Sequence, residues 1–163
     1  MVRPIQLDRR GVVRASAGAL AMALAPAACA RDAHAFDLRI GRDAGCSCCH
    51  AWSELMRQSG RFRVALIDEP DMAALKRRVG VPADLASCHT GVVEGYVVEG
   101  HVPAEDVLRL LSQRPARVRG LAVPGMPLGS PGMEQPDGAG DPYTVYAFET
   151  DGARSVFARH GAA

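Results

Sequence analysis

Three cysteines and one histidine lie within residues 46–50, directly before a segment with helical periodicity. A single buried cysteine packs as a small apolar side chain, but three within four residues cannot all be packing units. The helical pattern over residues 48–58 places Trp52, Leu55 and Met56 on one stripe. The thiols therefore lie at the start of a predicted helix, where the positive end of the helix dipole favours thiolate over thiol. This crowding predicts either thiol redox chemistry or soft-metal binding.

The length and composition are those of one ordinary globular domain. The chain has 163 residues, of which 48% are hydrophobic and 23% charged. Residues 1–35 contain five arginines and two aspartates, so residues 36–163 retain 14 basic and 16 acidic side chains. A domain so close to neutrality offers no electrostatic footprint for nucleic acid or an anionic membrane, and we expect neither as a partner.

Residues 1–35 are typical of an export signal. A basic start with adjacent arginines at positions 9 and 10 leads into the weakly apolar run 11–28, and residues 33–35 offer an A-x-A cleavage site. The arginine pair favours the twin-arginine route. The run is too short and too alanine-rich for a permanent span, so we expect a periplasmic protein. Lipid attachment at Cys29 is the alternative, which the residues before it disfavour.

The exported chain would contain four cysteines, Cys46, Cys48, Cys49 and Cys88, in a compartment where disulfides form. Their even number permits two disulfides. However, Cys48 and Cys49 are adjacent, and a bridge within residues 46–49 closes a very small ring that removes little unfolded-state entropy. We therefore do not expect structural disulfides in this loop.

Strands and helices alternate along residues 36–114. The predicted elements are strand 36–40, helix 48–58, strand 63–67, helix 71–79, two antiparallel strands within 91–99 that turn at Gly95, and helix 103–114. This order is that of the thioredoxin-like fold, an α/β class with a central mixed sheet and flanking helices. In that fold Val81-Pro82 would carry a cis-proline and bring Cys88 and His89 toward the cysteine loop.

The C-terminal part is predicted to be a loop followed by a β-hairpin. Residues 120–140 form the predicted loop, because the prolines and glycines within 121–136 exclude helix and central strand. Residues 141–157 then predict a hairpin that turns at 150–152 and completes the core.

Several unusual blocks recur in order along the chain. They are Cys-x-Cys-Cys at 46–49, Gly80-Val81-Pro82, Ser87-Cys88-His89-Thr90, Gly95-Tyr96, Val98-Glu99-Gly100-His101-Val102-Pro103, and the run 120–134 with Pro124, Met126, Pro127 and Met133. Over roughly residues 37–157 the chain resembles the CopG-type family of periplasmic copper-resistance proteins. The resemblance implies a thioredoxin-like domain that binds copper as a multi-copper thiolate cluster and has a copper redox role.

Residue chemistry supports a copper site independently of that resemblance. Copper(I) is a soft ion that selects thiolate and thioether ligands, and imidazole also suits copper. The four cysteines supply thiolates, and a C-x-C-C block is too compact to wrap one tetrahedral zinc ion. Thiolates that bridge several copper ions fit the adjacency of Cys48 and Cys49 better.

The histidines and methionines differ in their expected roles. His89 adjoins Cys88 and His101 lies at a strand-to-helix junction, so we expect both as ligands or as support for the ligands. His50 is expected to point into solvent, and His160, near the tail, to be inert. Met126 and Met133 are predicted accessory ligands, although the loop that carries them could simply cover the domain.

We therefore predict a periplasmic copper-resistance protein that binds several copper(I) ions through Cys46, Cys48, Cys49, Cys88, His89 and His101, with copper redox activity. Two alternatives stay open. The first is a thiol-disulfide oxidoreductase in which Cys46 or Cys49 attacks and Cys88 resolves. The second is a module that delivers copper to an efflux or electron-transfer partner, with the loop between Met126 and Met133 as its docking surface.

Overall fold

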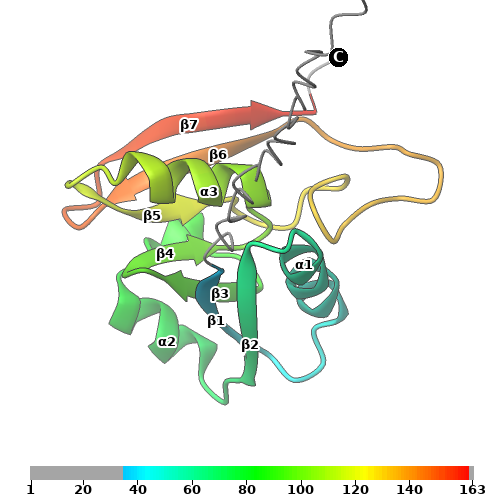
Figure 1. Ribbon diagram of the computed structural model, residues 1–163, viewed down its shortest axis with the longest axis horizontal. Helices are drawn as coiled ribbons and strands as arrows, with labels where there is room; N and C mark the ends of the chain where they lie inside the picture. The colour runs from blue at the N-terminus through cyan, green and yellow to red at the C-terminus, as the bar shows by residue number, and fades with distance from the viewer. Residues whose placement is uncertain (1–34, 162–163) are drawn as a thin grey trace, which may run out of the picture. The chain divides into compact units, whose positions relative to one another are not determined.

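The computed structural model describes residues 35–161, which form a seven-stranded mixed sheet with helices packed on it (Figure 1). The elements run β1 (Phe36–Arg42), α1 (Ser47–Gln58), β2 (Phe62–Asp68), α2 (Met72–Val79), a 3-10 turn η1 (Ala83–Leu85), β3 (His89–Val93), β4 (Tyr96–Glu99), α3 (Ala104–Gln113), β5 (Val118–Ala122), β6 (Tyr143–Glu149) and β7 (Arg154–His160). The predicted export signal, apart from its last residue, and the alternative anchor Cys29 lie outside the described residues. Within residues 35–161, no helix has the length and hydropathy needed to cross a bilayer.

The strand order in the sheet is β2-β1-β3-β4-β5-β6-β7. β1 pairs in parallel with β2 and antiparallel with β3, and β3 pairs antiparallel with β4. β5 joins β4 in parallel, and the β6–β7 hairpin extends the sheet antiparallel beyond it. The predicted alternation of strands and helices from β1 to α3 is confirmed, because each predicted element occurs in its predicted order. Since β1 leads directly into α1, the cysteine loop lies at the end of the sheet where β1 finishes.

One face of α1 packs into the core, but it is rotated from the predicted stripe. Trp52 and Met56 are buried, whereas Leu55 is 37% exposed and Ser53 is buried in its place. The buried positions follow the i, i+3, i+4, i+7 spacing of a helix face that starts at Cys49. The indole Nε1 of Trp52 donates to the carbonyl of Val102, at 2.9 Å, and so ties α1 to the segment before α3.

The predicted loop over 120–140 is wrong at its start, because Gly120–Ala122 belong to β5 in the middle of the sheet. Close packing within the sheet requires the glycine at position 120. A Cβ at this position would collide with the carbonyl of Val97 and the ring of Phe148. Glycine is used here for close approach of strands rather than for a turn.

The predicted cis-proline at Val81-Pro82 is also wrong, because the described residues contain no cis peptide bond. Pro82 has an ordinary extended conformation and forms the N-cap of η1, a position that the trans form fills without cost. The segment that carries Cys88 is held instead by hydrogen bonds from Ser87 and Thr90 to the buried carboxylate of Glu99.

The predicted C-terminal hairpin is confirmed as β6 and β7. Its turn contains Gly152, with φ of 85°, in the region that glycine favours. Val145, Ala147 and Phe148 of β6 are buried in the core, so the hairpin completes the sheet as expected.

Candidate metal centre

The cysteine loop is shaped by the start of α1. Cys46 is the N-cap residue, and its sulfur accepts a hydrogen bond from the backbone N–H of Cys49 at 3.3 Å. The guanidinium of Arg42, at the end of β1, donates to the carbonyls of Ala44 and Cys46 at 2.8 and 3.4 Å. The loop is therefore held from both sides, with its thiols at the positive end of the helix dipole.

Cys48 lies at the centre of the sulfur atoms. Its Sγ is 3.6 Å from Sγ of Cys46, 3.8 Å from Sγ of Cys88 and 3.9 Å from Sδ of Met126. The four cysteine sulfurs all lie within 4.8 Å of one another. Folding thus brings the distal thiol of Cys88 to the cysteine loop, and Cys88 and Cys48 are 40 residues apart in the sequence.

Cys46 and Cys49 form a disulfide, contrary to the expectation that this loop would have none. Their Cα atoms are 5.4 Å apart, a separation that a disulfide accepts. The entropy argument considered only how much such a bridge would stabilise the fold. The helix start brings residues three apart together regardless of that gain, so geometry permits the bond. Cys48 and Cys88 are free thiols.

Two buried histidines meet the thiol of Cys88. Nδ1 of His89 and Nε2 of His101 each lie 3.2 Å from Sγ of Cys88. Nδ1 of His101 lies 2.8 Å from the carbonyl oxygen of Pro131, which can only accept, so Nδ1 carries the proton. Nε2 of His101 therefore presents a lone pair toward the sulfur, as a ligand imidazole must.

Burial keeps these groups uncharged in the metal-free protein. It raises the pKa of the Cys88 thiol to about 12, with Cys48 adding to the effect. Burial also lowers the pKa of His89 well below its usual value, and repulsion that a protonated His89 would meet from a protonated His101 and from Lys76 lowers it further. The pKa of His101 is lowered by burial as well. A neutral imidazole binds a metal directly, whereas the thiol must first release its proton.

The residues fit a soft metal ion on structural grounds. Nε2 of His89 is buried and is without a hydrogen-bond partner among the described residues. An unpartnered buried polar atom is uncommon and asks for an explanation, such as an ion that the site takes up. Two ligand groups can be defined, one of the four cysteines and one of Cys88, His89 and His101, and Cys88 belongs to both.

The loop between β5 and β6 covers one side of the site. Figure 1 shows this yellow-to-orange segment passing beside α1. At Gly132, φ is 85° and a Cβ would lie only 2.7 Å from the backbone nitrogen of Trp52, so the loop approaches the start of α1 as closely as glycine allows. The loop therefore does more than connect strands, because its Pro131 carbonyl also orients His101.

Of the remaining residues considered in the sequence, Met126 contacts the sulfur cluster, and the contacts of Met133, His50 and His160 are different. Met126 is 51% exposed, and its sulfur joins the cluster through Cys48. Met133 is half-buried, and its hydrogen bonds within the described chain are those of its backbone. His50 is exposed, as expected. His160 pairs with Asp106, with 2.6 Å between Nε2 and Oδ2, so it has a structural contact although we expected it to be inert.

Sequence reasoning missed the buried carboxylate of Glu99. It accepts hydrogen bonds from the N–H of Ser87 at 2.6 Å and from Oγ1 of Thr90 at 2.7 Å, and it pairs with Nζ of Lys76 at 2.5 Å. Ser87 and Thr90 flank Cys88 and His89, so Glu99 anchors the segment that carries both. An acidic residue in the apolar strand β4 was the signal available in the sequence.

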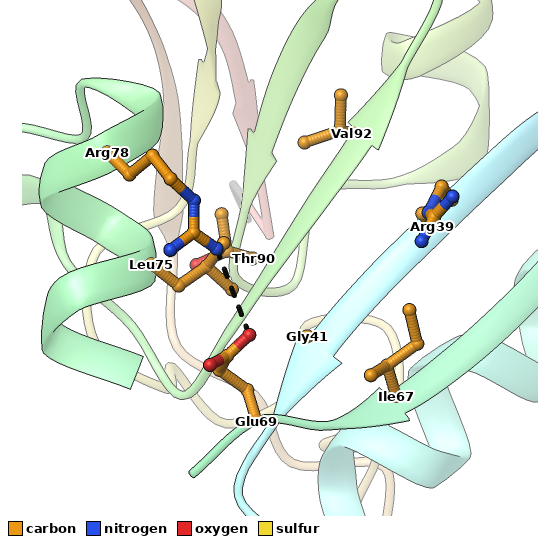
Figure 2. Close-up of a pocket in the computed structure, with 8 residues that line it drawn as sticks. All are labelled: Arg39, Gly41, Ile67, Glu69, Leu75, Arg78, Thr90 and Val92. Atoms are coloured by element: carbon orange, nitrogen blue, oxygen red, sulfur yellow. Dashed lines mark ion pairs between the residues drawn. The ribbon is translucent and has the colours of Figure 1, made fainter. Parts of the chain in front are cut away.

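A pocket of about 290 Å³ lies between α2 and strands β1 to β3 (Figure 2). Arg78 of α2 pairs with Glu69 at its rim, at 3.9 Å, and Thr90 forms part of its wall. Its lining residues are Arg39, Gly41, Ile67, Glu69, Leu75, Arg78, Thr90 and Val92, which include no thiol or imidazole. The pocket is therefore separate from the sulfur cluster.

The cysteine and histidine cluster defines a metal-binding protein of the α/β class, with the cluster at one end of its mixed sheet. A family model described as "Protein of unknown function, DUF411" matches residues 85–133. Two solved structures of copper resistance protein CopG, Form 1 and Form 2, are similar to this chain. They share 45% and 46% identity with it, cover 79% and 78% of it and 100% and 99% of their own chains, and each has a TM-score of 0.73. A search of curated proteins found no match. The chain belongs to the CopG family of copper resistance proteins.

Proposed function

We propose that the protein binds copper(I) in the cluster of Cys46, Cys48, Cys49, Cys88, His89 and His101, and that it serves copper resistance in the periplasm. The observation that carries this proposal is the position of Cys48, whose sulfur lies within 4 Å of three other sulfur atoms from separate parts of the loop and the chain. Thiolates, a thioether and imidazoles are the ligands that copper(I) selects.

Several copper ions share the site in this proposal. Cys88 belongs to both ligand groups, so its thiolate can bridge an ion held by the cysteine loop and an ion held by His89 and His101. The adjacency of Cys48 and Cys49 also favours bridging, because two neighbouring cysteines cannot place their sulfurs on opposite sides of one ion. The full cluster requires the disulfide to be reduced, since each of the four thiolates is needed.

We infer that β1 to β4 with α1 to α3 form a thioredoxin-like unit. The β2-β1-β3-β4 order, with one parallel and two antiparallel pairings, supports this inference. The β5 strand and the β6–β7 hairpin extend that unit. Redox proteins of this fold also carry thiols at a helix N-terminus near the end of the sheet. The shared fold does not decide the function, which depends on the residues of the site.

Anaerobic reconstitution tests the copper site. Fully reduced protein should take up more than one copper(I) per chain and retain it through gel filtration against a competing copper(I) chelator. His50→Ala is the matched control, because this exposed imidazole adjoins Cys49 yet lies outside the ligand set, and its copper content should equal that of the wild type. Absence of tight copper(I) uptake by the reduced protein contradicts the proposal.

A thiol-disulfide oxidoreductase is the second candidate, and the Cys46–Cys49 disulfide at the start of α1 favours it. The bridge joins two loop cysteines, so Cys49 rather than Cys88 is the resolving partner of Cys46 in this structure. The metal-free protein should then catalyse the reduction of a disulfide substrate. Catalysis that persists in Cys88→Ser but disappears in Cys46→Ser would favour this candidate over the copper site.

Delivery of copper to an efflux or electron-transfer partner is the third candidate. The exposed thioether of Met126, next to Cys48, favours it, because an ion at the rim is accessible to a second protein. Copper transfer from the loaded protein to an acceptor can be followed directly, and this candidate predicts that its rate depends on Met126.

A further inference from the structure

The pocket between α2 and the sheet contains none of the proposed copper ligands (Figure 2). Its sheet side is set by the strand register. Arg39 of β1 lies opposite Val92 of β3. Gly41 of β1 lies opposite Thr90 of β3 and Ile67 of β2. Because side chains alternate along a strand, these five residues share one face of the sheet, opposite the face that packs on α1 and α3.

The short helix α2 covers only part of this face. It packs on β1 through Leu75, and a Cβ at Gly41 would collide with that side chain, so the glycine lets the helix lie close to the sheet. Beyond Leu75 the face is less covered, since Ile67 in the edge strand β2 is 39% exposed and Val92 is half-buried. Apolar side chains from one helix and two strands therefore line a partly open cavity of about 290 Å³.

Two guanidinium groups border this cavity, and neither is fully neutralised. Arg39 forms no ion pair or hydrogen bond with another residue in the described part of the chain. Its neighbour on the same face of β1, Asp37, pairs with Arg63 at 2.8 Å. Nη2 of Arg78 lies 3.9 Å from Oε2 of Glu69, which is too far for a hydrogen bond. The rim therefore has an excess of positive charge that an anion would satisfy.

We propose that this pocket binds a small amphiphilic carboxylate, whose apolar body packs on Ile67, Leu75 and Val92 and whose carboxylate pairs with Arg39. A guanidinium presents two parallel N–H donors that match the two oxygens of a carboxylate. Arg78, on the other side of the cavity, adds attraction for the anion.

The lining excludes simpler occupants. An inorganic anion would pair with Arg39 but leave the apolar side chains of Ile67 and Val92 exposed to water. A neutral apolar molecule would cover them but leave the charge of Arg39 without a partner. Apolar walls with few polar groups at the rim are usual for small-molecule sites, and this cavity is at the small end of their range.

Octanoate is the probe that tests the site. It is titrated into isotope-labelled protein without copper, and the backbone amides are followed by NMR. We expect saturable shifts at Arg39, Gly41, Ile67, Thr90 and Val92, with a Kd of about 0.1 to 1 mM. Acetate lacks the apolar body and 1-octanol lacks the charge, so each should bind about tenfold more weakly or worse.

Variants separate the two parts of the ligand. Arg39→Gln should weaken octanoate binding about tenfold and leave 1-octanol binding unchanged. Ile67→Thr keeps a β-branched side chain on the exposed edge strand but removes apolar area, and it should weaken octanoate binding about three- to tenfold. Arg159→Gln is the matched control, because this exposed arginine lies in β7 at the other edge of the sheet. It should bind octanoate as the wild type does, and circular dichroism checks that each variant is folded.

The outcomes decide between occupants. The proposal is wrong if octanoate at about ten times the expected Kd leaves the pocket amides unshifted, or if Arg39→Gln binds it as the wild type does. Equal affinities for octanoate and acetate would reduce the site to an anion patch, and equal affinities for octanoate and 1-octanol to an apolar patch. A short acidic peptide that displaces octanoate at lower concentration would make the occupant a protein segment instead. The proposed copper site is unaffected by each of these results, since its ligands lie outside the pocket.

Discussion

His101 and His160 are two buried or half-buried imidazoles whose partners differ. The Nδ1 of His101 donates to the carbonyl of Pro131, which leaves Nε2 with a lone pair directed at Cys88. The Nε2 of His160 instead meets the carboxylate of Asp106, and its ring stacks on Tyr143 at 5.1 Å. Either partner can orient an imidazole for a metal, so the difference lies in what the other ring nitrogen faces. Nε2 of His101 faces the thiol of Cys88, whereas the two ligand groups found among the described residues do not include His160. The comparison predicts a metal ligand at His101 and a structural hydrogen bond at His160.

The largest effect is expected for Cys88→Ser, because Cys88 belongs to both ligand groups and contacts His101. Copper(I) bound per reduced chain should fall by more than half in equilibrium dialysis. The fold should persist, since Cys88 is only half-buried and lies in a loop. A variant that is globally unfolded by circular dichroism would count against the placement of this thiol.

The pH dependence of copper binding should come from Cys88, the thiol that His101 contacts, rather than from the histidines. Its pKa of about 12 keeps the thiol protonated at neutral pH, so each binding event at this thiol releases a proton. Raising the pH therefore favours binding, and this one thiol should contribute a roughly tenfold rise in the apparent association constant per pH unit between pH 6 and 8. His89 and His101 should add little in this range, because their pKa values are lowered and their imidazoles are already neutral. Affinities that are independent of pH in competition titrations would show that Cys88 is not a ligand.

His101→Ala and His160→Ala form a crossed pair of variants. His101→Ala should weaken copper(I) binding about 10- to 100-fold, the range typical when a group that supports a metal site is lost. His160→Ala should leave copper affinity unchanged and lower the free energy of unfolding by about 1 to 3 kcal/mol, because buried Asp106 loses a hydrogen-bond partner. Copper titration and urea denaturation measure the two effects. Equal losses of affinity in both variants would remove the distinction between the two histidines.

Glu99→Gln addresses how Cys88 and His89 are positioned. The substitution leaves Lys76, which is 14% exposed at its side chain, without its carboxylate partner, and should cost about 3 kcal/mol of unfolding free energy. Copper affinity should fall less than in His101→Ala, because Glu99 holds the loop rather than the ion. Thr150→Ala, in the turn between β6 and β7, is a control for general effects of substitution. A stability equal to that of the wild type would show that the ion pair does not hold this segment.

The smallest effect is expected at the two methionines. Met126→Leu should slow transfer of copper(I) to an acceptor without changing the number of ions bound, because the exposed thioether lies beside Cys48. Met133→Leu is its matched control in the same loop and should leave the rate unchanged. Stopped-flow transfer to a chromogenic chelator compares them. Identical rates in both variants would exclude the loop from copper exchange.

The regular elements near the site could be predicted from the sequence because their signals are local. Apolar spacing placed the start of α1 at the cysteines, and the turn glycines ended the strands of the two hairpins. The choice of ligand residues also followed from local chemistry, since three thiols in four residues have few other uses. The end of β5 was predicted as loop because Gly120 serves a close approach between strands, which is a tertiary requirement.

The amino-acid sequence by itself determined the element order and the chemical types that could meet a soft metal. Only the tertiary structure decided which of them do meet. Cys48 and Cys88 are 40 residues apart, and His101 and Pro131 are 30 apart, so no local pattern could reveal that the first pair nearly touches or that the second sets a tautomer. The physical reason is that periodicity reports how a segment buries its own face, whereas the geometry of a site depends on how separate segments pack against one another.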